Sequence, residues 1–220
     1  PSSHHVSLQM TAKVELIWAT PDAEKLIVKM ARVSNPANED NWETGPKLLR
    51  YLLKHKHVSP FEMACMCVKI QTERDIAAQI LRHSSFSFQE FSTRYQKTGA
   101  AEVPRFRRQD EKNRQNSFDD VHPTHQGDFQ KRTQRVFSDI FTLYESLLRD
   151  GVAKETARRI LPLCTPTTMY MQGNLRSWIH YIQVRTNEDT QLEHRQVALQ
   201  CLRIFKECFP TVAEAAFDTV

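Results

Sequence analysis

The sequence predicts an α+β fold, in which helices and strands are mixed without regular βαβ alternation. The chain has only five glycines, and none of them forms a GxGxxG or P-loop turn of the kind that nucleotide-binding βαβ units use. Its 220 residues are 40% apolar and 25% charged, a balance typical of a globular chain that buries a core. We therefore expect one domain without internal repeats.

The N-terminal part is predicted to form a strand, two helices and a second strand. Residues 13–20, KVELIWAT, are a strand, and residues 21–34 are a helix with Pro21 in its first turn. Residues 42–57 are a helix, because leucines recur along one face. Residues 63–72, MACMCVKIQT, are almost continuously apolar, which indicates a central strand.

The middle of the chain changes from regular to irregular sequence. Residues 74–83, RDIAAQILRH, are predicted to form a short helix. Residues 86–95, FSFQEFSTRY, alternate between apolar and polar in the manner of a strand. Residues 97–124 are polar and are expected to be irregular and mobile.

The C-terminal part is predicted to be mainly helical. Apolar residues at helical spacing predict a long helix that ends at Gly151, and Pro162 stops the next segment. Asn174 is expected to cap a helix. The expected helices are 129–151, 153–162, 174–185 and 190–210, with a strand at 165–172.

The composition excludes several classes of protein. Five cysteines, an odd number without a CxxC pair, argue against a disulfide framework and a zinc site, and no metal site is expected. Free thiols, no membrane-spanning run and no signal peptide predict a cytoplasmic protein that does not enter a membrane. The leader PSSHHVSLQ, residues 1–9, is expected to be non-native, with Met10 as the natural start. The formal charge of +4 permits anionic small molecules without requiring nucleic acid.

Three polar side chains share one face of the helix predicted at 74–83. Gln79, Arg82 and His83 lie at positions i, i+3 and i+4. In the strand that follows, Glu90 and its alternate neighbours Ser92 and Arg94 are expected to point the same way. A carboxylate, a hydroxyl and a guanidinium on one face suit a ligand with phosphate and sugar hydroxyls. The structural alternative is a surface helix in which Arg82 pairs with Glu90.

Two later arginines extend this pattern. Arg158 lies in ETARRILP, and Arg185 ends the predicted helix WIHYIQVR. Since the chain lacks a glycine-rich phosphate loop, side chains must grip any phosphate, and arginine matches phosphate geometry best. A basic residue in a last helical turn also interacts with the helix dipole, which is the alternative for Arg185.

The stretch RHSSFSFQEFSTR, residues 82–94, resembles the RHRxxSxNxxSxR signature of flavin-dependent thymidylate synthases, the ThyX family. HVSPFE upstream, and ARRILP, NLRSWIHYIQVR and TQLEH downstream, are similar to other blocks of that family in the same order. The resemblance covers about Lys13 to Phe217. It implies a ThyX-like fold, a mainly antiparallel sheet flanked by helices, with residues 10–220 as a single flavin-dependent thymidylate synthase domain. The matching positions are Arg82, His83, Ser87, Ser92 and Arg94.

Two positions depart from the signature. Ser84 stands where the signature has Arg, which removes a cation that would help to hold flavin or folate. Weaker cofactor binding is therefore expected, unless another basic group substitutes. Gln89 stands in place of Asn and keeps the amide on a longer stem.

The resemblance also implies a reaction and its partners. dUMP would be methylated to dTMP, with 5,10-methylenetetrahydrofolate as one-carbon donor, FAD as hydride carrier and NADPH as reductant. The family forms homotetramers whose active sites lie between subunits. The positions that match dUMP contacts are Gln79, Arg82, Glu90, Phe91, Ser92, Thr93, Arg94, Arg158 and Arg185. Those that match FAD or folate contacts are His57, Ser59, Arg82, His83, Ser84, Glu90, Asn174, Arg176 and His180.

Two of these positions carry catalytic expectations. Arg185 matches the arginine that faces the pyrimidine, where a fixed cation favours negative charge on the ring. Ser92 is expected to be a substrate ligand and not a nucleophile, because no histidine is assigned beside it as a base. His180, which replaces an amide often seen in the family, can still donate a hydrogen bond.

Two other functions stay open on the sequence. Residues 105–115, RFRRQDEKNRQ, are basic and contain an aromatic residue, which permits binding of single-stranded nucleic acid, although Asp110 and Glu111 favour a solvated loop. The second alternative follows from Ser84: because the signature arginine is absent, the chain is also compatible with a non-catalytic member of the family that only binds a nucleotide.

Overall fold

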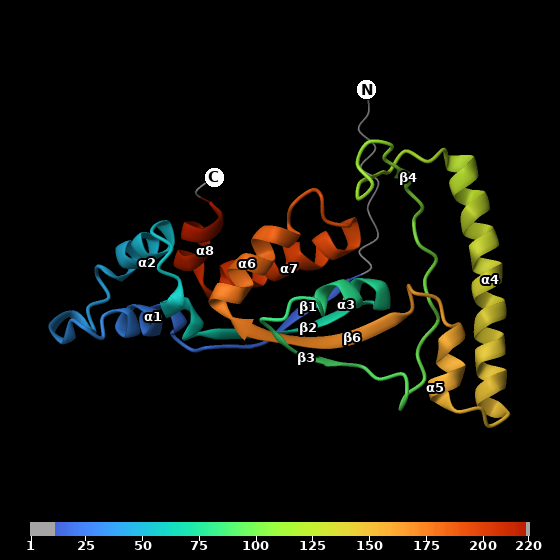
Figure 1. Ribbon diagram of the computed structural model, residues 1–220, viewed down its shortest axis with the longest axis horizontal. Helices are drawn as coiled ribbons and strands as arrows, with labels where there is room; N and C mark the ends of the chain where they lie inside the picture. Colours follow the sequence, from blue (N-terminus) through green and yellow to red (C-terminus); the bar gives the residue numbers. More distant parts are fainter. Residues whose placement is uncertain (1–11, 219–220) are drawn as a thin grey trace.

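The computed structural model describes residues 12–218, so the predicted leader and Met10 lie outside the described residues. Four strands form an antiparallel sheet in the order β1-β2-β6-β3. Helices α3, α6 and α7 lie along one face of this sheet (Figure 1). The prediction of an α+β fold with a mainly antiparallel sheet flanked by helices is confirmed. The strands are β1 (Lys13–Ala19), β2 (Cys65–Glu73), β3 (Ser87–Glu90) and β6 (Pro166–Asn174).

The N-terminal elements form where the sequence predicts them. β2 lies between β1 and β6, as expected for its continuous apolar run. The first two helices are α1 (Ala23–Ala31) and α2 (Gly45–Lys54), and α2 packs against the C-terminal helix. Two short 3₁₀ helices connect these elements, η1 (Pro36–Asn38) and η2 (Ser59–Glu62).

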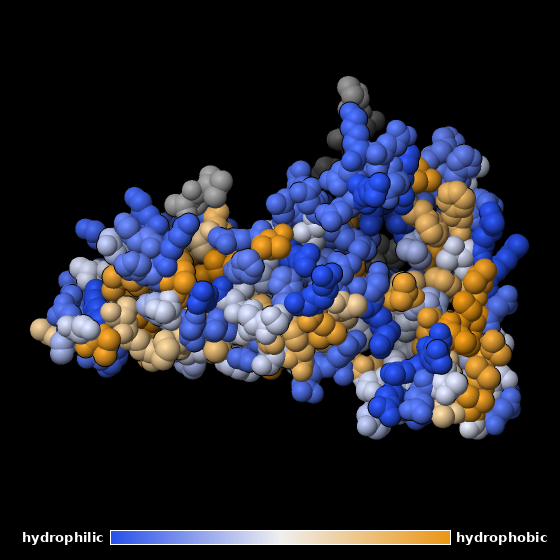
Figure 2. Space-filling view, viewed as in Figure 1, coloured by the Kyte–Doolittle hydropathy of each residue, from blue (hydrophilic) through white to orange (hydrophobic). Residues whose placement is uncertain are grey.

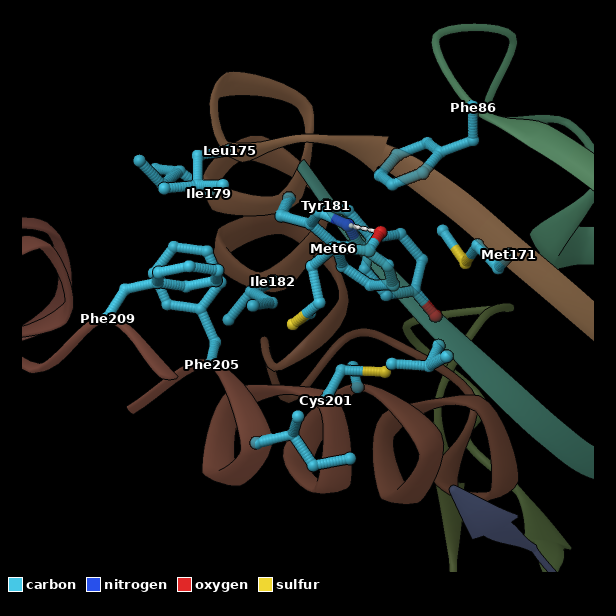
Figure 3. Packing of buried hydrophobic residues seen from close by; sticks show 14 of the residues in the cluster. Met66, Phe86, Met171, Leu175, Ile179, Tyr181, Ile182, Cys201, Phe205 and Phe209 are labelled. Atoms are coloured by element: carbon cyan, nitrogen blue, oxygen red, sulfur yellow. Dashed lines mark hydrogen bonds between the residues drawn. The ribbon is translucent and has the colours of Figure 1, made fainter. Parts of the chain in front are cut away.

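The core lies between the sheet and the helices above it (Figure 3). Trp178 is fully buried and satisfies its indole by donating Nε1–H to the carbonyl of Met66 at 2.9 Å. Phe86 packs edge-on against Trp178 with ring centroids 4.9 Å apart. A Cβ on Gly173 would lie 2.5 Å from the Phe86 ring, so only glycine lets this ring reach the sheet. The anchoring of Phe86 fixes where the chain enters β3.

The helix α3 (Arg74–Ile80) ends earlier than predicted. Arg82 and His83 lie in the turn after it, held by backbone bonds to the carbonyls of Gln79 and Ile80. The prediction that Gln79, Arg82 and His83 share one helical face is therefore wrong. The chain must turn here because Phe86 is drawn into the core only a few residues later.

The strand β3 is also shorter than predicted, because it ends at Glu90. The amide of Arg94 donates to Ser92 Oγ at 3.3 Å, and the amide of Tyr95 donates to the Ser92 carbonyl at 3.1 Å. A serine that hydrogen-bonds nearby backbone offers the chain a turn in place of a strand. The prediction that Glu90, Ser92 and Arg94 share a strand face is therefore wrong.

The polar segment after β3 is partly ordered into a small hairpin. Its strands are β4 (Arg108–Gln109) and β5 (Ser117–Phe118), where the sequence predicted irregular structure. The helix α4 (Pro123–Arg149) begins six residues earlier than predicted, with Pro123 in its first turn and the His122 side chain accepting from the amide of Thr124. Gly151, with φ of 85°, follows its end as predicted. α4 stands at one end of the molecule (Figure 1).

The C-terminal elements bring the candidate residues to the sheet. α5 (Lys154–Ala157) and η3 (Arg158–Ile160) precede β6. The Asn174 side chain accepts from the amide of Ser177 at 2.9 Å, which confirms its capping of α6 (Leu175–Arg185). α7 (Leu192–Cys208) is followed by α8 (Pro210–Phe217), which the sequence did not predict. Among the described residues, every helix is too short or too polar to cross a bilayer.

Candidate active site

The end of α6 meets the turn after α3 through two candidate residues. Arg185, in the last turn of α6, donates Nε–H to Nε2 of His83 at 3.0 Å. His83 packs edge-on against the ring of Tyr181, one turn earlier on α6, with centroids 4.9 Å apart. Both predicted residues are therefore brought together, and the core positions them through Tyr181, which is fully buried.

His83 is held in the neutral form. Burial, followed by the proximity of Arg185 and His180, lowers the pKa of His83 from 6.5 to about 4. An arginine Nε can only donate, so Nε2 of His83 must offer a lone pair and the ring proton must sit on Nδ1. The histidine therefore orients the guanidinium and adds no charge of its own.

A second histidine links this pair to Gln79. His194 is fully buried in α7, and its Nε2 lies 3.1 Å from the hydroxyl of Tyr181. Its Nδ1 lies 3.3 Å from Oε1 of Gln79. Burial lowers the pKa of His194 from 6.5 to about 3, with Arg185 and His83 adding to the effect. We name these five residues, Gln79, His83, Tyr181, Arg185 and His194, the Arg185 group.

The chain of hydrogen bonds continues outward from Gln79. Its Nε2 donates to Oε1 of Gln191 at 2.7 Å, and Nε2 of Gln191 donates to Oε2 of Glu193 at 3.0 Å. Arg107 grips Glu193 with two bonds of 2.6 and 2.9 Å. Burial alone would raise the pKa of Glu193, but the bonds from Arg107 lower it below its ordinary value. The segment before α4 is thereby tied to the first turn of α7.

The other candidate phosphate ligands form a separate cluster near α5. The Arg158 guanidinium donates to Oγ1 of Thr93 at 3.2 Å, and Thr93 is almost fully buried. Arg94 pairs with Glu155 at 3.2 Å on the surface. We name the cluster of Glu90, Thr93, Arg94, Arg158 and Thr167 the Arg158 group, in which Thr167 donates to Oε1 of Glu90 at 2.9 Å. Within residues 12–218, no hydrogen bond or ion pair joins it to the Arg185 group.

Three candidate arginines have no carboxylate partner in the part of the chain that the structure describes: Arg82, Arg158 and Arg185. Arg185 and Arg158 are also half-buried, so each is a partly desolvated cation. A cation removed from water gains most from an anionic partner. The arrangement can therefore receive phosphate, or negative charge that develops on a bound ring.

A cavity of about 310 Å³ adjoins the Arg158 group, and Phe91 and Thr167 contribute to its wall. Glu73, at the end of β2, also lines it. Burial, then the neighbouring carboxylates Asp75, Glu193 and Glu102, raise the pKa of Glu73 from 4.5 to about 7. Glu73 was not among the predicted site residues, because a glutamate at the end of a strand is an ordinary feature until its neighbours in space are known.

The residues that match FAD or folate contacts come from three parts of the chain. His57 and Ser59 lie at η2, Asn174, Arg176 and His180 at the end of β6 and in α6, and Arg82, His83, Ser84 and Glu90 in the turn after α3 and at the end of β3. Arg176 pairs with Glu62 of η2, and the amide of Leu175 donates to the carbonyl of Ala64 at 2.9 Å. The side chain of Asn174 is already used as a helix cap. The exposed members of the set are His57, Ser59, Arg82, Ser84, Arg176 and His180.

Five members of the hydrogen-bond chain were given no role from the sequence: Tyr181, His194, Gln191, Glu193 and Arg107. The block TQLEH pointed to three of them without giving them a role. Their partners come from α3, α6 and the segment before α4, so no local spacing reveals the contacts. The similarity of the block TQLEH to the family was the signal for Gln191, Glu193 and His194.

The basic stretch 105–115 is largely neutralised. Arg105 pairs with Asp119 at 2.7 Å and Arg108 with Asp120 at 2.6 Å. Arg107 is committed to Glu193. Nucleic-acid binding needs arginines that are free to neutralise phosphates, so this stretch gives little support to that alternative.

Comparisons with known proteins agree with the fold and with the family resemblance. Residues 15–211 match the model of a family described as thymidylate synthase complementing protein, Thy1. A relative from Synechocystis, named flavin-dependent thymidylate synthase, is 50% identical over 192 residues, which cover 87% of this chain and 88% of the relative. One from Paramecium bursaria Chlorella virus 1, named probable flavin-dependent thymidylate synthase, is 49% identical over 194 residues, covering 88% and 90%.

A solved structure is similar over almost the whole chain. It is a UMP/dUMP methylase, PolB from Streptomyces cacaoi, bound with 5-Br dUMP. The TM-score is 0.83 at 26% sequence identity, and the alignment covers 94% of this chain and 95% of PolB. The similarity therefore extends to the sheet and to the helices that carry the candidate residues.

Proposed function

The chain belongs to the flavin-dependent thymidylate synthase family, and from that membership we propose that it catalyses the reductive methylation of dUMP to dTMP. 5,10-Methylenetetrahydrofolate is the one-carbon donor and NADPH the reductant. When bound, FAD supplies the hydride chemistry that amino-acid side chains lack. The protein's own task is to bind the nucleotide, orient it and stabilise the charge that develops on its ring.

The fixed guanidinium of Arg185 carries this proposal. Its Nε is held by His83, and neither Nη atom has a hydrogen-bond partner within residues 12–218. A preorganised cation in a partly water-excluded site stabilises negative charge without having to reorient during the reaction. In the proposed function, Arg185 faces the pyrimidine and favours the charged form of the ring, and the neutral His83 keeps the guanidinium in place.

The Arg158 group is proposed to hold the phosphate of dUMP. Arg158 and Arg94 are the cations, and charge-assisted bonds from guanidinium forks suit a phosphate dianion. Ser92 is a substrate ligand in this proposal, since its hydroxyl has only a backbone amide as a hydrogen-bond partner within the described chain. Gln79, Arg82, Glu90, Phe91 and Thr93 are the further proposed dUMP contacts.

Residues of η2, of the turn after α3 and of α6 offer donors that fit FAD and folate. The exposed Arg82, Ser84 and His180 have no side-chain hydrogen bond to another described residue, so they keep donors for phosphate, ribose or pterin oxygens. The other proposed contacts are His57, Ser59, His83, Glu90, Asn174 and Arg176. Asn174 would bind through its amide nitrogen, because its oxygen caps α6.

We propose that the active site forms between subunits of a homotetramer. α4 is mostly exposed, yet it presents Phe129, Val136 and Leu143 to solvent, with exposures of 41%, 54% and 51%. Figure 2 shows the apolar side chains running along this helix. An apolar face of this kind is typical of a subunit interface. Because no hydrogen bond or ion pair joins the Arg185 and Arg158 groups within residues 12–218, a second copy would complete each site in this proposal.

One turnover experiment tests the activity. Purified protein is incubated with dUMP, methylenetetrahydrofolate, FAD and NADPH, and dTMP is measured. We expect dTMP to form only when all four are present, with bleaching of the flavin by NADPH before turnover. Flavin binding and dUMP binding without any dTMP would support a non-catalytic nucleotide-binding relative instead. Oligonucleotide binding that falls steeply with salt, without dTMP, would support the nucleic-acid alternative.

Mixing two impaired variants, assayed at a dUMP concentration well below the KM of R158A, tests the shared site. R185A and R158A each lose one group, so a hybrid oligomer can assemble sites with both groups intact. Part of the activity is expected to return after the two proteins are mixed and their subunits exchanged. If mixed oligomers form but the activity does not return, both groups belong to a site within one chain.

The five cysteines are all unpaired, which suits the reducing cytoplasm that we propose as its location.

A further inference from the structure

The amide of Gln79 has two chemically different ends. Its oxygen can only accept hydrogen bonds and its nitrogen can only donate them. What Gln79 offers to a ligand therefore depends on which end faces the site. The residues around it decide this orientation from both sides.

On the side that faces Gln191, the orientation of the Gln79 amide is fixed by the carboxylate of Glu193. Glu193 is gripped by Arg107 and is ionised, so it only accepts. Gln191 must therefore turn its NH₂ toward Glu193 and its oxygen toward Gln79, and the two amide atoms that meet lie 2.7 Å apart. That oxygen requires the nitrogen of Gln79.

On the side that faces the core, the orientation of the Gln79 amide is fixed by His194. With its nitrogen turned outward, Gln79 presents Oε1 to Nδ1 of His194, which must then carry the ring proton. His194 is fully buried, and its lowered pKa leaves it with a single proton. Nε2 is therefore bare and accepts from the hydroxyl of Tyr181, whose raised pKa keeps that proton in place. From Tyr181 to Glu193, each residue therefore donates to the next one along this hydrogen-bond chain.

We propose that His194 is a positioning residue, which locks the Gln79 amide so that its second N–H is presented to an acceptor oxygen of dUMP. The nitrogen of Gln79 carries two hydrogens, and Gln191 takes one. Gln191 is exposed, whereas His194 is fully buried, so the inner anchor is the firmer one. The ligand assignment rests on the proposed function, but the orientation of the amide does not. A ligand donor held in advance binds without paying for its own ordering.

Two substitutions at His194 separate positioning from packing. H194N places an amide donor near the position of Nδ1, and H194L fills similar space without a donor. H194L is expected to raise the KM for dUMP about 3- to 10-fold, the effect of one misplaced hydrogen bond. The KM for methylenetetrahydrofolate should stay unchanged, and H194N should recover most of the loss.

Gln200 offers a matched control on the same helix. It is also buried and polar, and it bonds the amide of Val14 and the carbonyl of Ala12, away from the site. Q200M is expected to lower the melting temperature and to leave the KM for dUMP unchanged. Equal KM shifts in H194N, H194L and Q200M, or no shift in H194L, would overturn the positioning role.

A spectroscopic readout tests the orientation without turnover and without a variant that must fold. In protein labelled with ¹⁵N-histidine, the ring of His194 should show the Nδ1–H tautomer at pH 7.5. The Nε2–H tautomer, or a protonated ring, would overturn the inference. If the wild type neither binds nor converts dUMP while His194 shows the Nδ1–H form, the proposed function fails and the orientation of Gln79 stands.

Discussion

The two groups of candidate residues differ in how the chain holds them. The Arg185 group is built onto the core: Tyr181 and His194 are fully buried, and each hydrogen bond that the side chains of the group make is to another side chain. The Arg158 group gathers at the end of β3 and the start of β6. Its threonines are buried, but Arg94 and the Glu155 that pairs with it are more than half exposed. The first group is preorganised by the fold, and the second is open.

This difference supports the proposal that the Arg185 group serves the reaction and the Arg158 group serves binding of the phosphate. Groups that stabilise a transition state gain from rigidity, because any reorganisation would cost part of the stabilisation. Groups that bind a phosphate can be exposed before binding, because the ligand itself orders them. An exposed ion pair such as Arg94–Glu155 contributes little stability, so Arg94 can exchange its partner for a phosphate at small cost.

The largest expected effect tests the rigid group. R185A should lower kcat about 100- to 1,000-fold at saturating dUMP, because the preorganised charge is lost. R185K keeps a charge but cannot reproduce the bond from Nε to His83, so it should be intermediate. Steady-state kinetics measure both variants. An R185A enzyme within a few fold of the wild type would remove the distinction between the two groups.

The next effect tests the open group. R158A should raise the KM for dUMP roughly 10- to 100-fold with a smaller change in kcat, because a charged hydrogen bond to phosphate is lost. R159A is the matched control, since Arg159 is exposed and has no side-chain partner within the described residues. A loss in kcat without a change in KM would place Arg158 with the catalytic machinery.

Substitution of Ser92 tests whether this residue binds the substrate or takes part in the chemical step. S92A should keep measurable turnover, with a loss of about tenfold or less, because it removes one neutral hydroxyl from the substrate contacts. The dTMP assay and dUMP binding by calorimetry check this together. Complete loss of turnover with intact folding and dUMP binding would make Ser92 a catalytic group.

The histidines of the Arg185 group and Glu73, in the cavity beside the Arg158 group, should respond to pH in opposite directions. His83 and His194 have folded-state pKa values of about 4 and about 3, below the ordinary 6.5, so the unfolded chain binds more protons between these values. Their contribution to the free energy of unfolding is full above pH 6.5 and falls as the pH drops. Glu73 has a folded-state pKa raised from 4.5 to about 7, so its contribution falls as the pH rises through that window.

The variant E73Q tests the pH dependence that Glu73 introduces. It should raise the free energy of unfolding at pH 8 by about 1–2 kcal/mol, a value discounted for solvent screening, and change it little at pH 4.5. Urea titrations at fixed protein concentration measure this. Equal effects of E73Q at the two pH values would show that Glu73 has the same pKa in both states.

The smallest effect concerns the departure from the family signature. Ser84 is exposed and has no side-chain partner within residues 12–218, so an arginine there has room. S84R should lower the Kd for FAD a few fold by adding one exposed charge near a phosphate-bearing ligand. Flavin fluorescence titration measures it, with S85R as a control on the next exposed residue. No change in FAD affinity or in turnover would show that the serine is not a deficit.

Local patterns in the sequence were enough for most elements. The leucine spacing of α2, the apolar run of β2 and the cap at Asn174 act over a few residues, so they could be predicted without knowing the fold. The two wrong predictions share a cause. Helical and strand spacing were extended through residues 82–83 and 92–94, where the burial of Phe86 and the turn at Ser92 end the regular structure.

The sequence by itself determined the fold class, the family motif and the identity of the candidate arginines, because these depend on composition and on spacing along the chain. Only the tertiary structure decided that Arg185 rests on His83, that His194 reaches Gln79, and that Arg158 belongs to another cluster. Each of these contacts joins residues far apart in the chain. Their charges and protonation states depend on burial, which exists only once the helices have packed on the sheet.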